Sequence, residues 1–252
     1  MTTHTTAALA KVRKLLAKAE DPAATPAEAE IYTAKAAQLI ADHGIDVALL
    51  AADDPGSDRV ADRVVHMDAP YAREKAQLLS TVAVGLRCRA VLRTRAPFDA
   101  PREHSVHLFG HESDLERADL LFTSLLLQST GRLGRTPVPH GEHQAAFRRS
   151  WLAGFRISIA ERLRRSEEEA ERRAEARSAP TGRSTSLVLA DRSREVDHAV
   201  AEQYPQLRTA RPSSLSGSGM QAGYEAGARA DLGGARLRGT PQALASDQRL
   251  GA

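Results

Sequence analysis

The sequence predicts an α+β protein in which a small, mainly antiparallel sheet is packed with helices. Residues 86–95 alternate between apolar and arginine side chains, a pattern typical of a strand with one buried face. Residues 104–109 predict a second strand, which Gly110 ends. The apolar repeats on either side of this pair have helical spacing. Because a sheet of this kind must bury its apolar face, we expect the flanking helices to cover it.

The N-terminal segment predicts a helical hairpin. Residues 7–20 place apolar side chains on one face and lysines elsewhere, as in an amphipathic helix. Pro26 opens a second helix with the features of a capping box, and the helical pattern continues to His43. Gly44 is expected to end that helix in the left-handed conformation. A further short helical turn over residues 45–50 completes the hairpin.

This hairpin resembles the domain of unknown function 2786 family, a short bacterial and phage module. The matching runs are KVRKLLAKAED and TPAEAEIYTAKAAQLIADHGID. The positions in register with the family pattern are Lys11, Leu15, Leu16, Glu28, Ala29, Ala36, Leu39, His43, Gly44 and Asp46. The chain from Tyr71 onwards is similar to a companion, the domain of unknown function 7168. The resemblance implies a hairpin over residues 7–50 and a companion domain over residues 62–207, and it implies no catalytic residue or activity.

Three shorter features lead up to and follow the central strands. The polar and acidic segment 51–61 is expected to be the linker between the two domains. Residues 60–67 predict a short strand, and residues 71–84 predict a helix before the central strands. After those strands, Ser113 or Asp114 is expected to cap a strongly apolar helix. The core of these elements should be aliphatic, because aromatic residues form only 4% of the chain.

The second half of the chain predicts one dominant helix. From Glu142 onwards large apolar residues recur every four positions, as on one face of a helix. Residues 164–178 are instead highly charged and are expected to extend this helix into solvent. Residues 187–189 predict a third strand, and residues 194–204 predict a helix. The low-complexity residues 208–252 form a predicted tail that is disordered in part, although its small residues also suit one closely packed helix.

Composition narrows the function classes. The single cysteine, Cys88, excludes an intrachain disulfide and an all-cysteine zinc site. The first residues do not follow the pattern of a signal peptide, and no run is apolar for long enough to span a membrane, so the expected location is the cytoplasm. A net charge of +3 permits a polyanionic partner such as nucleic acid. No cofactor is predicted.

An arginine-rich strand face provides the leading functional hypothesis, a non-enzymatic module that binds nucleic acid. If the apolar positions of residues 86–95 point inwards, the opposite face carries Arg87, Arg89, Arg93 and Arg95. Side chains on one strand face repeat about every 7 Å, close to the spacing of phosphates along a nucleic acid strand. The lysines that would extend this surface are Lys11, Lys14 and Lys18. Alternatively, these charges only protect an exposed strand from aggregation.

Two further hypotheses are compatible with the sequence. A metal-dependent hydrolase would need several histidines to converge, although the helical H-E-x-x-H pattern is absent. The histidines concerned are His104, His107, His111, His140 and His143. A structural or assembly protein would instead contact a protein partner through the charged segment 164–178. None of these patterns assigns a catalytic residue or an oligomeric state.

Overall fold

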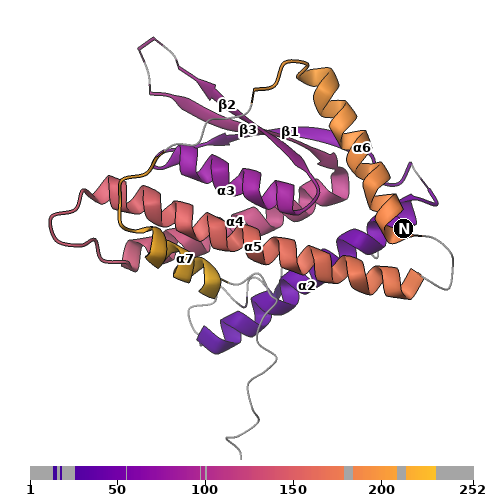
Figure 1. Ribbon diagram of the computed structural model, residues 1–252, viewed down its shortest axis with the longest axis horizontal. Helices are drawn as coiled ribbons and strands as arrows, with labels where there is room; N and C mark the ends of the chain where they lie inside the picture. Colours follow the sequence, from indigo (N-terminus) through magenta and orange to yellow (C-terminus); the bar gives the residue numbers. More distant parts are fainter. Residues whose placement is uncertain are drawn as a thin grey trace, which may run out of the picture.

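The computed structural model describes residues 14, 15, 18, 26–54, 56–96, 98–99, 101–178, 184–208 and 214–230. These residues form helices around a three-stranded antiparallel sheet, which confirms the α+β class (Figure 1). The helices are α2 (Pro26–Ala51), α3 (Ala72–Gly85), α4 (Glu112–Arg135), α5 (Gln144–Ser178), α6 (Thr185–Gln203) and α7 (Met220–Arg229). The strands are β1 (Val60–Met67), β2 (Arg89–Arg95) and β3 (Glu103–His111). Most of the predicted helix 7–20 and the tail beyond residue 230 lie outside the described residues.

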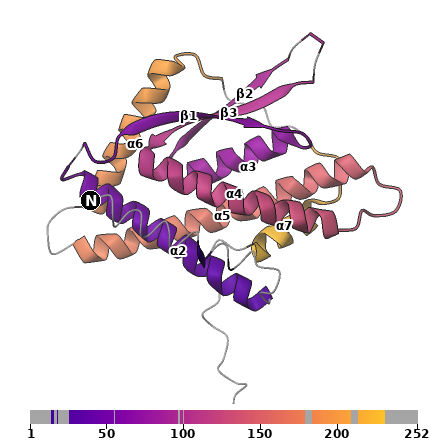
Figure 2. The same cartoon turned by 180° about the vertical axis from the view of Figure 1, so that it is seen from behind.

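The sheet has the order β1–β3–β2, with β3 in the centre. The β1–β3 register runs from Val60 opposite His111 to Met67 opposite His104. Even-numbered positions of β3, such as Val106, point to the core beneath the sheet, where α3 and α4 lie. The odd-numbered positions form the other side, which we call the outer face. Helix α6 crosses part of the outer face, and the rest is open (Figures 1 and 2).

The predicted apolar stripe on α5 forms the centre of the core. Phe147, Trp151, Phe155, Ile159 and Leu163 are all buried, as their four-residue spacing requires. The rings of Trp151 and Phe155 stack with their centroids 5.5 Å apart. Helix α5 therefore packs against α3 on one side and α2 on another. No helix in the described ranges combines the length and apolarity needed to cross a membrane.

The small residues near the C-terminus form the closely packed helix α7. A Cβ atom on Gly223 would lie 1.8 Å from the carbonyl oxygen of Trp151, and one on Gly227 would lie 2.7 Å from that of Phe155. Only glycine permits such an approach, because any larger residue would collide with the backbone of α5. Of the two outcomes expected for this stretch, the structure therefore shows the packed helix.

The charged end of α5 is not a solvated extension on every side. Ala170 and Ala174 are buried against Ala41 and Ile45 of α2. Ion pairs flank this contact, with Arg173 3.0 Å from Asp42 and Arg177 3.1 Å from Asp46. One side of segment 164–178 is thus used within the chain, because alanines spaced four apart leave room for a second helix.

A predicted helix stop and a predicted strand are wrong. Helix α2 runs unbroken from Pro26 to Ala51, so Gly44 is a buried helical residue and not a stop. Residues 187–189 belong to α6 and do not add a strand to the sheet. The buried residues Leu189, Arg192 and Val196 recur at helical spacing, and this period over a long segment outweighs the β preference of three residues.

Candidate nucleic-acid interface

The predicted arginine strand begins later than its sequence pattern. Leu86 and Cys88 are fully buried, as alternation requires, but β2 starts only at Arg89. Arg87 lies in the turn before it, in the left-handed conformation (φ 66°), where strand alternation no longer sets the direction of its side chain. That side chain is 16% exposed and pairs with Glu167 of α5. The prediction that Arg87 shares a solvent-facing surface with the other arginines is therefore wrong.

Arg87 belongs to a buried network of six charged side chains. The members are Arg87, Arg117, Arg192, Asp58, Asp114 and Glu167. Fully buried Arg117 donates from Nη1 to Asp114 at 2.5 Å and from Nη2 to Glu167 at 2.6 Å. Arg192 donates to Asp58 at 2.7 Å and to Asp114 at 3.4 Å. Three positive and three negative charges balance, so removing one would leave a partner buried and uncompensated.

Asp58 of the predicted linker 51–61 completes the N-terminus of α4. It accepts hydrogen bonds from the backbone N–H of Ser113 at 3.1 Å and from its hydroxyl at 2.7 Å. Burial alone would raise the pKa of Asp58, but the bonds from Ser113 and the Arg192 contact outweigh burial and hold that pKa below its ordinary value. The expected cap at Ser113 or Asp114 is wrong, because both residues lie inside the first turn and Asp58 binds the free N–H group.

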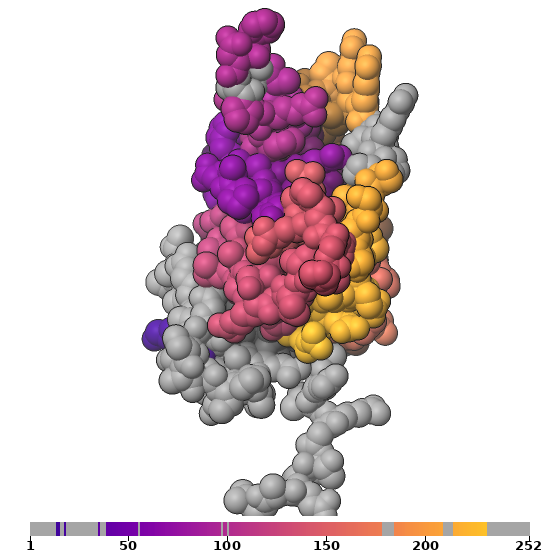
Figure 3. All heavy atoms as spheres, turned by 90° about the vertical axis from the view of Figure 1, so that its left-hand side faces the viewer, coloured from indigo at the N-terminus to yellow at the C-terminus, as the bar shows by residue number. Residues whose placement is uncertain are grey.

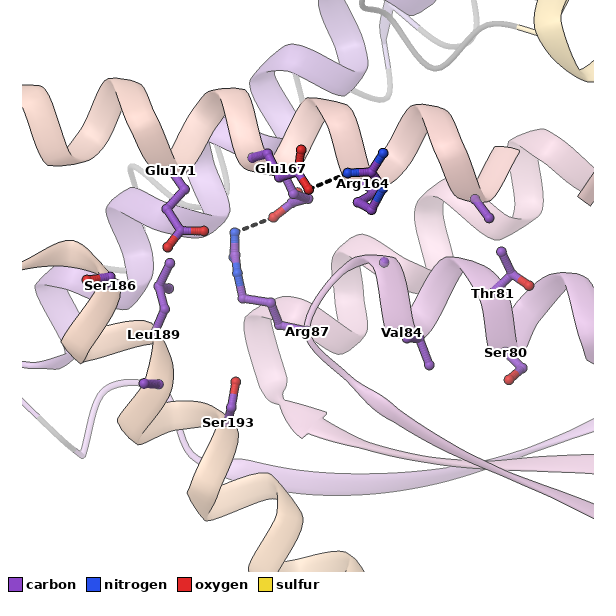
Figure 4. Close-up of a pocket in the computed structure, with 14 residues that line it drawn as sticks. Ser80, Thr81, Val84, Arg87, Arg164, Glu167, Glu171, Ser186, Leu189 and Ser193 are labelled. Atoms are coloured by element: carbon purple, nitrogen blue, oxygen red, sulfur yellow. Dashed lines mark hydrogen bonds and ion pairs between the residues drawn. The ribbon is translucent and has the colours of Figure 1, made fainter. Parts of the chain in front are cut away.

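An open cavity of about 740 Å³ lies between α3, α5 and α6, with Arg87 on its wall (Figure 4). Both arginines of its lining are occupied, since Arg87 pairs with Glu167 and Arg164 donates to Glu168 at 2.5 Å. Glu171 on the same wall adds a negative charge. The cavity therefore presents no unpaired cation to a phosphate among its lining residues.

Arg89 lies on the outer face, but its guanidinium group is occupied. Nε donates to Oδ1 of Asp197 at 2.6 Å, and Nη2 donates to Oδ2 at 3.1 Å, which is the bidentate arrangement favoured by arginine. The two side chains are 35% and 56% exposed, so solvent screens this pair more than those of the buried network. Arg89 thus attaches α6 to the sheet.

Arg93 and Arg95 occupy the predicted surface. Both are exposed on the outer face, and no ion pair seen within the described part of the chain involves either. Arg93 lies opposite Ser105 of β3, and Ser105 lies opposite His66 of β1. We call Arg93, Ser105 and His66 the outer-face row. Because directly paired residues point to the same side of a sheet, three hydrogen-bond donors stand next to one another.

The other predicted cations contribute unequally to this surface. Arg95 lies opposite Glu103, whose carboxylate offsets part of its charge. Lys14 and Lys18 are exposed helical residues, while Lys11 lies outside the described residues. The structure thus brings Arg93 and Arg95 together and separates Arg87 from them.

His107 connects three elements on the covered half of the outer face. Its Nε2 lies 2.7 Å from the carboxylate of Asp62 on β1, and its Nδ1 lies 2.7 Å from the hydroxyl of Tyr204, just beyond α6. Since a carboxylate only accepts, Nε2–H donates to Asp62, and Nδ1 shares the second hydrogen bond with the Tyr204 hydroxyl. The Phe109 ring packs 4.3 Å from the His107 ring. The sequence offers no signal for this contact, because its members are far apart in the chain.

The five histidines of the predicted metal site do not converge. His111 is buried and donates from Nδ1 to a backbone carbonyl at 3.1 Å. His104 lies on the opposite face of the sheet from His107, while His140 and His143 are exposed between α4 and α5. Across the described ranges, no group of three or more His, Cys, Asp or Glu side chains is arranged to hold a metal ion. The hydrolase hypothesis therefore has no metal site among these histidines.

Comparison with known proteins finds a family match at the N-terminus. Residues 7–47 match the family described as a protein of unknown function (DUF2786), which confirms the first part of the resemblance. No curated protein and no solved structure matches the chain. The matched segment includes His43 and Gly44 of α2, so it reaches the buried network around Arg117.

Proposed function

We propose that this protein is a non-enzymatic module that associates with nucleic acid through the open part of its outer face. The outer-face row is the observation that supports the proposal. Arg93 is exposed and its charge is not neutralised by an ion pair in the described structure. The guanidinium group of Arg93, the hydroxyl of Ser105 and the imidazole of His66 are all donors suited to phosphate oxygens.

The spacing of Arg93 and Arg95 along β2 suits them to the repeating phosphates of a nucleic acid backbone. Arg93 and Arg95 lie two residues apart on one strand, so their side chains emerge about 7 Å from each other. Arginine can bind a phosphate with two parallel hydrogen bonds, which fixes its direction as well as its distance. Contacts of this kind carry no sequence information, so the expected binding is electrostatic and tolerant of sequence.

Three finer statements belong to the same proposal. We expect the segment from residue 62 to residue 207 to be related to the domain of unknown function 7168. We also expect a bacterial or phage origin and a cytoplasmic location, where nucleic acid is accessible. The resemblance of the sequence supports the first two, and the third rests on the proposed nucleic-acid partner.

The test compares two double variants that remove the same charge. Fluorescence anisotropy would follow labelled oligonucleotides at several salt concentrations for the wild type, for Arg93→Ala with Arg95→Ala, and for Arg135→Ala with Arg165→Ala. The control arginines are exposed on α4 and α5. We expect the strand variant to raise Kd by about tenfold or more and to reduce the slope of log K against log salt by about two, because two phosphate contacts are lost.

The control variant should stay within about twofold of the wild type, because it removes the same net charge elsewhere. Equal losses in the two double variants would show that only overall charge matters and would contradict this surface. Absence of salt-dependent binding by the wild type would refute the association with nucleic acid itself.

A further inference from the structure

Beyond the end of β1, the sheet narrows to a two-stranded ribbon. β1 ends at Met67 opposite His104, so the pair Arg95 and Glu103 has no third strand beside it. All described residues from Leu92 to Glu103 are exposed, which means that neither side of this ribbon is covered. Figures 1 and 3 show the β2–β3 end projecting beyond the helices. A two-stranded ribbon is marginally stable without packing, so a projecting one suits contact with another surface.

The ribbon carries an exposed aromatic side chain between its arginines. Phe98 is 101% exposed, and Leu92 is 43% exposed. Residues 92–103 contain Arg93, Arg95 and Arg102 against Asp99 and Glu103. The excess charge is positive, as a polyanionic partner requires, and the apolar group lies at the end furthest from the core.

Resting on the proposed function, we infer that this ribbon enters a groove of double-stranded nucleic acid with Phe98 leading. β-ribbons can enter either groove of a DNA duplex, and proteins that enter the minor groove often insert an apolar side chain between two base pairs. In that position Arg93 and Arg95 on the ribbon face the phosphates, and Phe98 presses against the base pairs as an apolar wedge.

A single strand is the less suitable partner. Proteins that bind single strands stack successive bases on several aromatic side chains. Among the Phe, Tyr and Trp residues described in β1, β2, β3 and the loop between β2 and β3, Phe98 alone is exposed, because Phe109 is buried and packed beside Tyr204. One aromatic group at a tip provides a wedge and does not provide a stacking platform.

The experiment uses the full chain with a duplex and a single strand of the same sequence. Each duplex carries 2-aminopurine, whose fluorescence rises when a base step is unstacked. We expect the wild type to bind the duplex more tightly and to raise the fluorescence. Phe98→Ala should abolish that rise and weaken duplex binding about fivefold, while its salt dependence and its affinity for the single strand stay unchanged. Leu127→Ala removes a side chain that is 57% exposed on α4 and should change none of these values.

Each other outcome has a distinct meaning. If the wild type binds the single strand at least as tightly as the duplex, or if Phe98→Ala binds like the wild type without loss of fluorescence, the groove assignment is overturned while nucleic-acid association stands. If the wild type binds neither form, both the ribbon inference and the proposed function fail. Binding to anionic phosphatidylglycerol vesicles that is lost in Phe98→Ala would then identify a membrane surface as the partner.

Discussion

Gly44 of α2 lies directly against the guanidinium group of Arg117 on α4. A Cβ atom at position 44 would stand 1.9 Å from Nη1 of Arg117 and 2.1 Å from its Cζ. The guanidinium group is held in place because Asp114 and Glu167 both accept its hydrogen bonds. Glycine at this position therefore lets the buried guanidinium group of Arg117 lie against the backbone of α2. Through this contact the family-matched segment, residues 7–47, packs against α4.

Gly44→Ala should destabilise the protein. The added methyl group must displace Arg117 from its carboxylate partners, and disrupting a buried ion pair costs about 3 kcal/mol. Urea denaturation of the two proteins measures the change in the free energy of unfolding. Gly131→Ala is the matched control, since a Cβ atom there meets nothing within 4 Å and alanine favours the helix. A loss for Gly44→Ala no larger than that of the control would contradict the close contact.

The stability of the fold should fall as the pH drops below 6.5, and His43 should contribute to this fall. Burial, and then the positive charge of Arg117, lower the pKa of His43 from its ordinary value of 6.5, with Asp46 acting in the opposite direction. Above pH 6.5 the group is neutral in both states and contributes nothing. Below that pH the unfolded chain binds the proton more readily, so stability decreases towards the lower pKa of the folded state.

Melting temperatures at pH 8 and pH 5.5 test this linkage. His43→Gln should lose less stability than the wild type between the two values, because it has no proton to take up. His140→Gln is the control, since His140 is exposed between α4 and α5 and no ion pair within the described ranges involves it, and its loss should equal that of the wild type. Identical losses in all three proteins would exclude His43 as a source of the pH dependence.

The parts of the fold that sequence periodicity predicted are those that depend on local spacing. The four-residue stripe of α5 predicts one buried helix face, and the alternation that begins at residue 86 predicts that Leu86 and Cys88 are buried; both predictions are confirmed. The failures depend on distant partners. Gly44 has the sequence appearance of a helix stop, but Arg117, from another helix, decides its role. In the same way Arg87 pairs with Glu167 of α5 and does not join the exposed arginines of β2.

For the candidate site, too, local spacing was predictable and contacts between distant residues were not. Alternation within one strand was sufficient to place Arg93 and Arg95 on a common surface. Their neighbours Ser105 and His66 depend on the register between three strands, which no local pattern specifies.

Replacing Arg87 should lower the stability of the fold much more than replacing Arg93. Arg87→Ala leaves one oxygen of Glu167 without its cation inside the fold, and we expect a loss of about 2 kcal/mol in the free energy of unfolding. Arg93→Ala removes an exposed side chain and should change that free energy by less than about 0.5 kcal/mol. Chemical denaturation of both variants gives the comparison. Equal losses would mean that Arg93 also has a structural partner.

Tyr204→Phe should loosen the end of α6 from the sheet. The change removes the hydroxyl that is hydrogen-bonded to Nδ1 of His107 and keeps the ring, so the expected cost is about 1 kcal/mol. Hydrogen exchange should rise in the last turns of α6. Tyr71→Phe is the control, because the Tyr71 hydroxyl has no hydrogen-bond partner within the described structure, and its exchange pattern should match the wild type.

Glu103→Gln should strengthen the binding of nucleic acid. Glu103 lies directly opposite Arg95, where its charge opposes an approaching phosphate and offsets the arginine. The amide keeps the size of the side chain and removes the charge, so we expect Kd to fall about threefold at low salt, with the difference disappearing as salt screens the ribbon. Glu116→Gln on the exposed side of α4 changes the net charge equally and should have a smaller effect. Anisotropy titrations at two salt concentrations measure Kd for both variants. A larger gain in affinity for Glu116→Gln would contradict an interface at the β2–β3 ribbon, because a screened charge acts most strongly on a phosphate close to it.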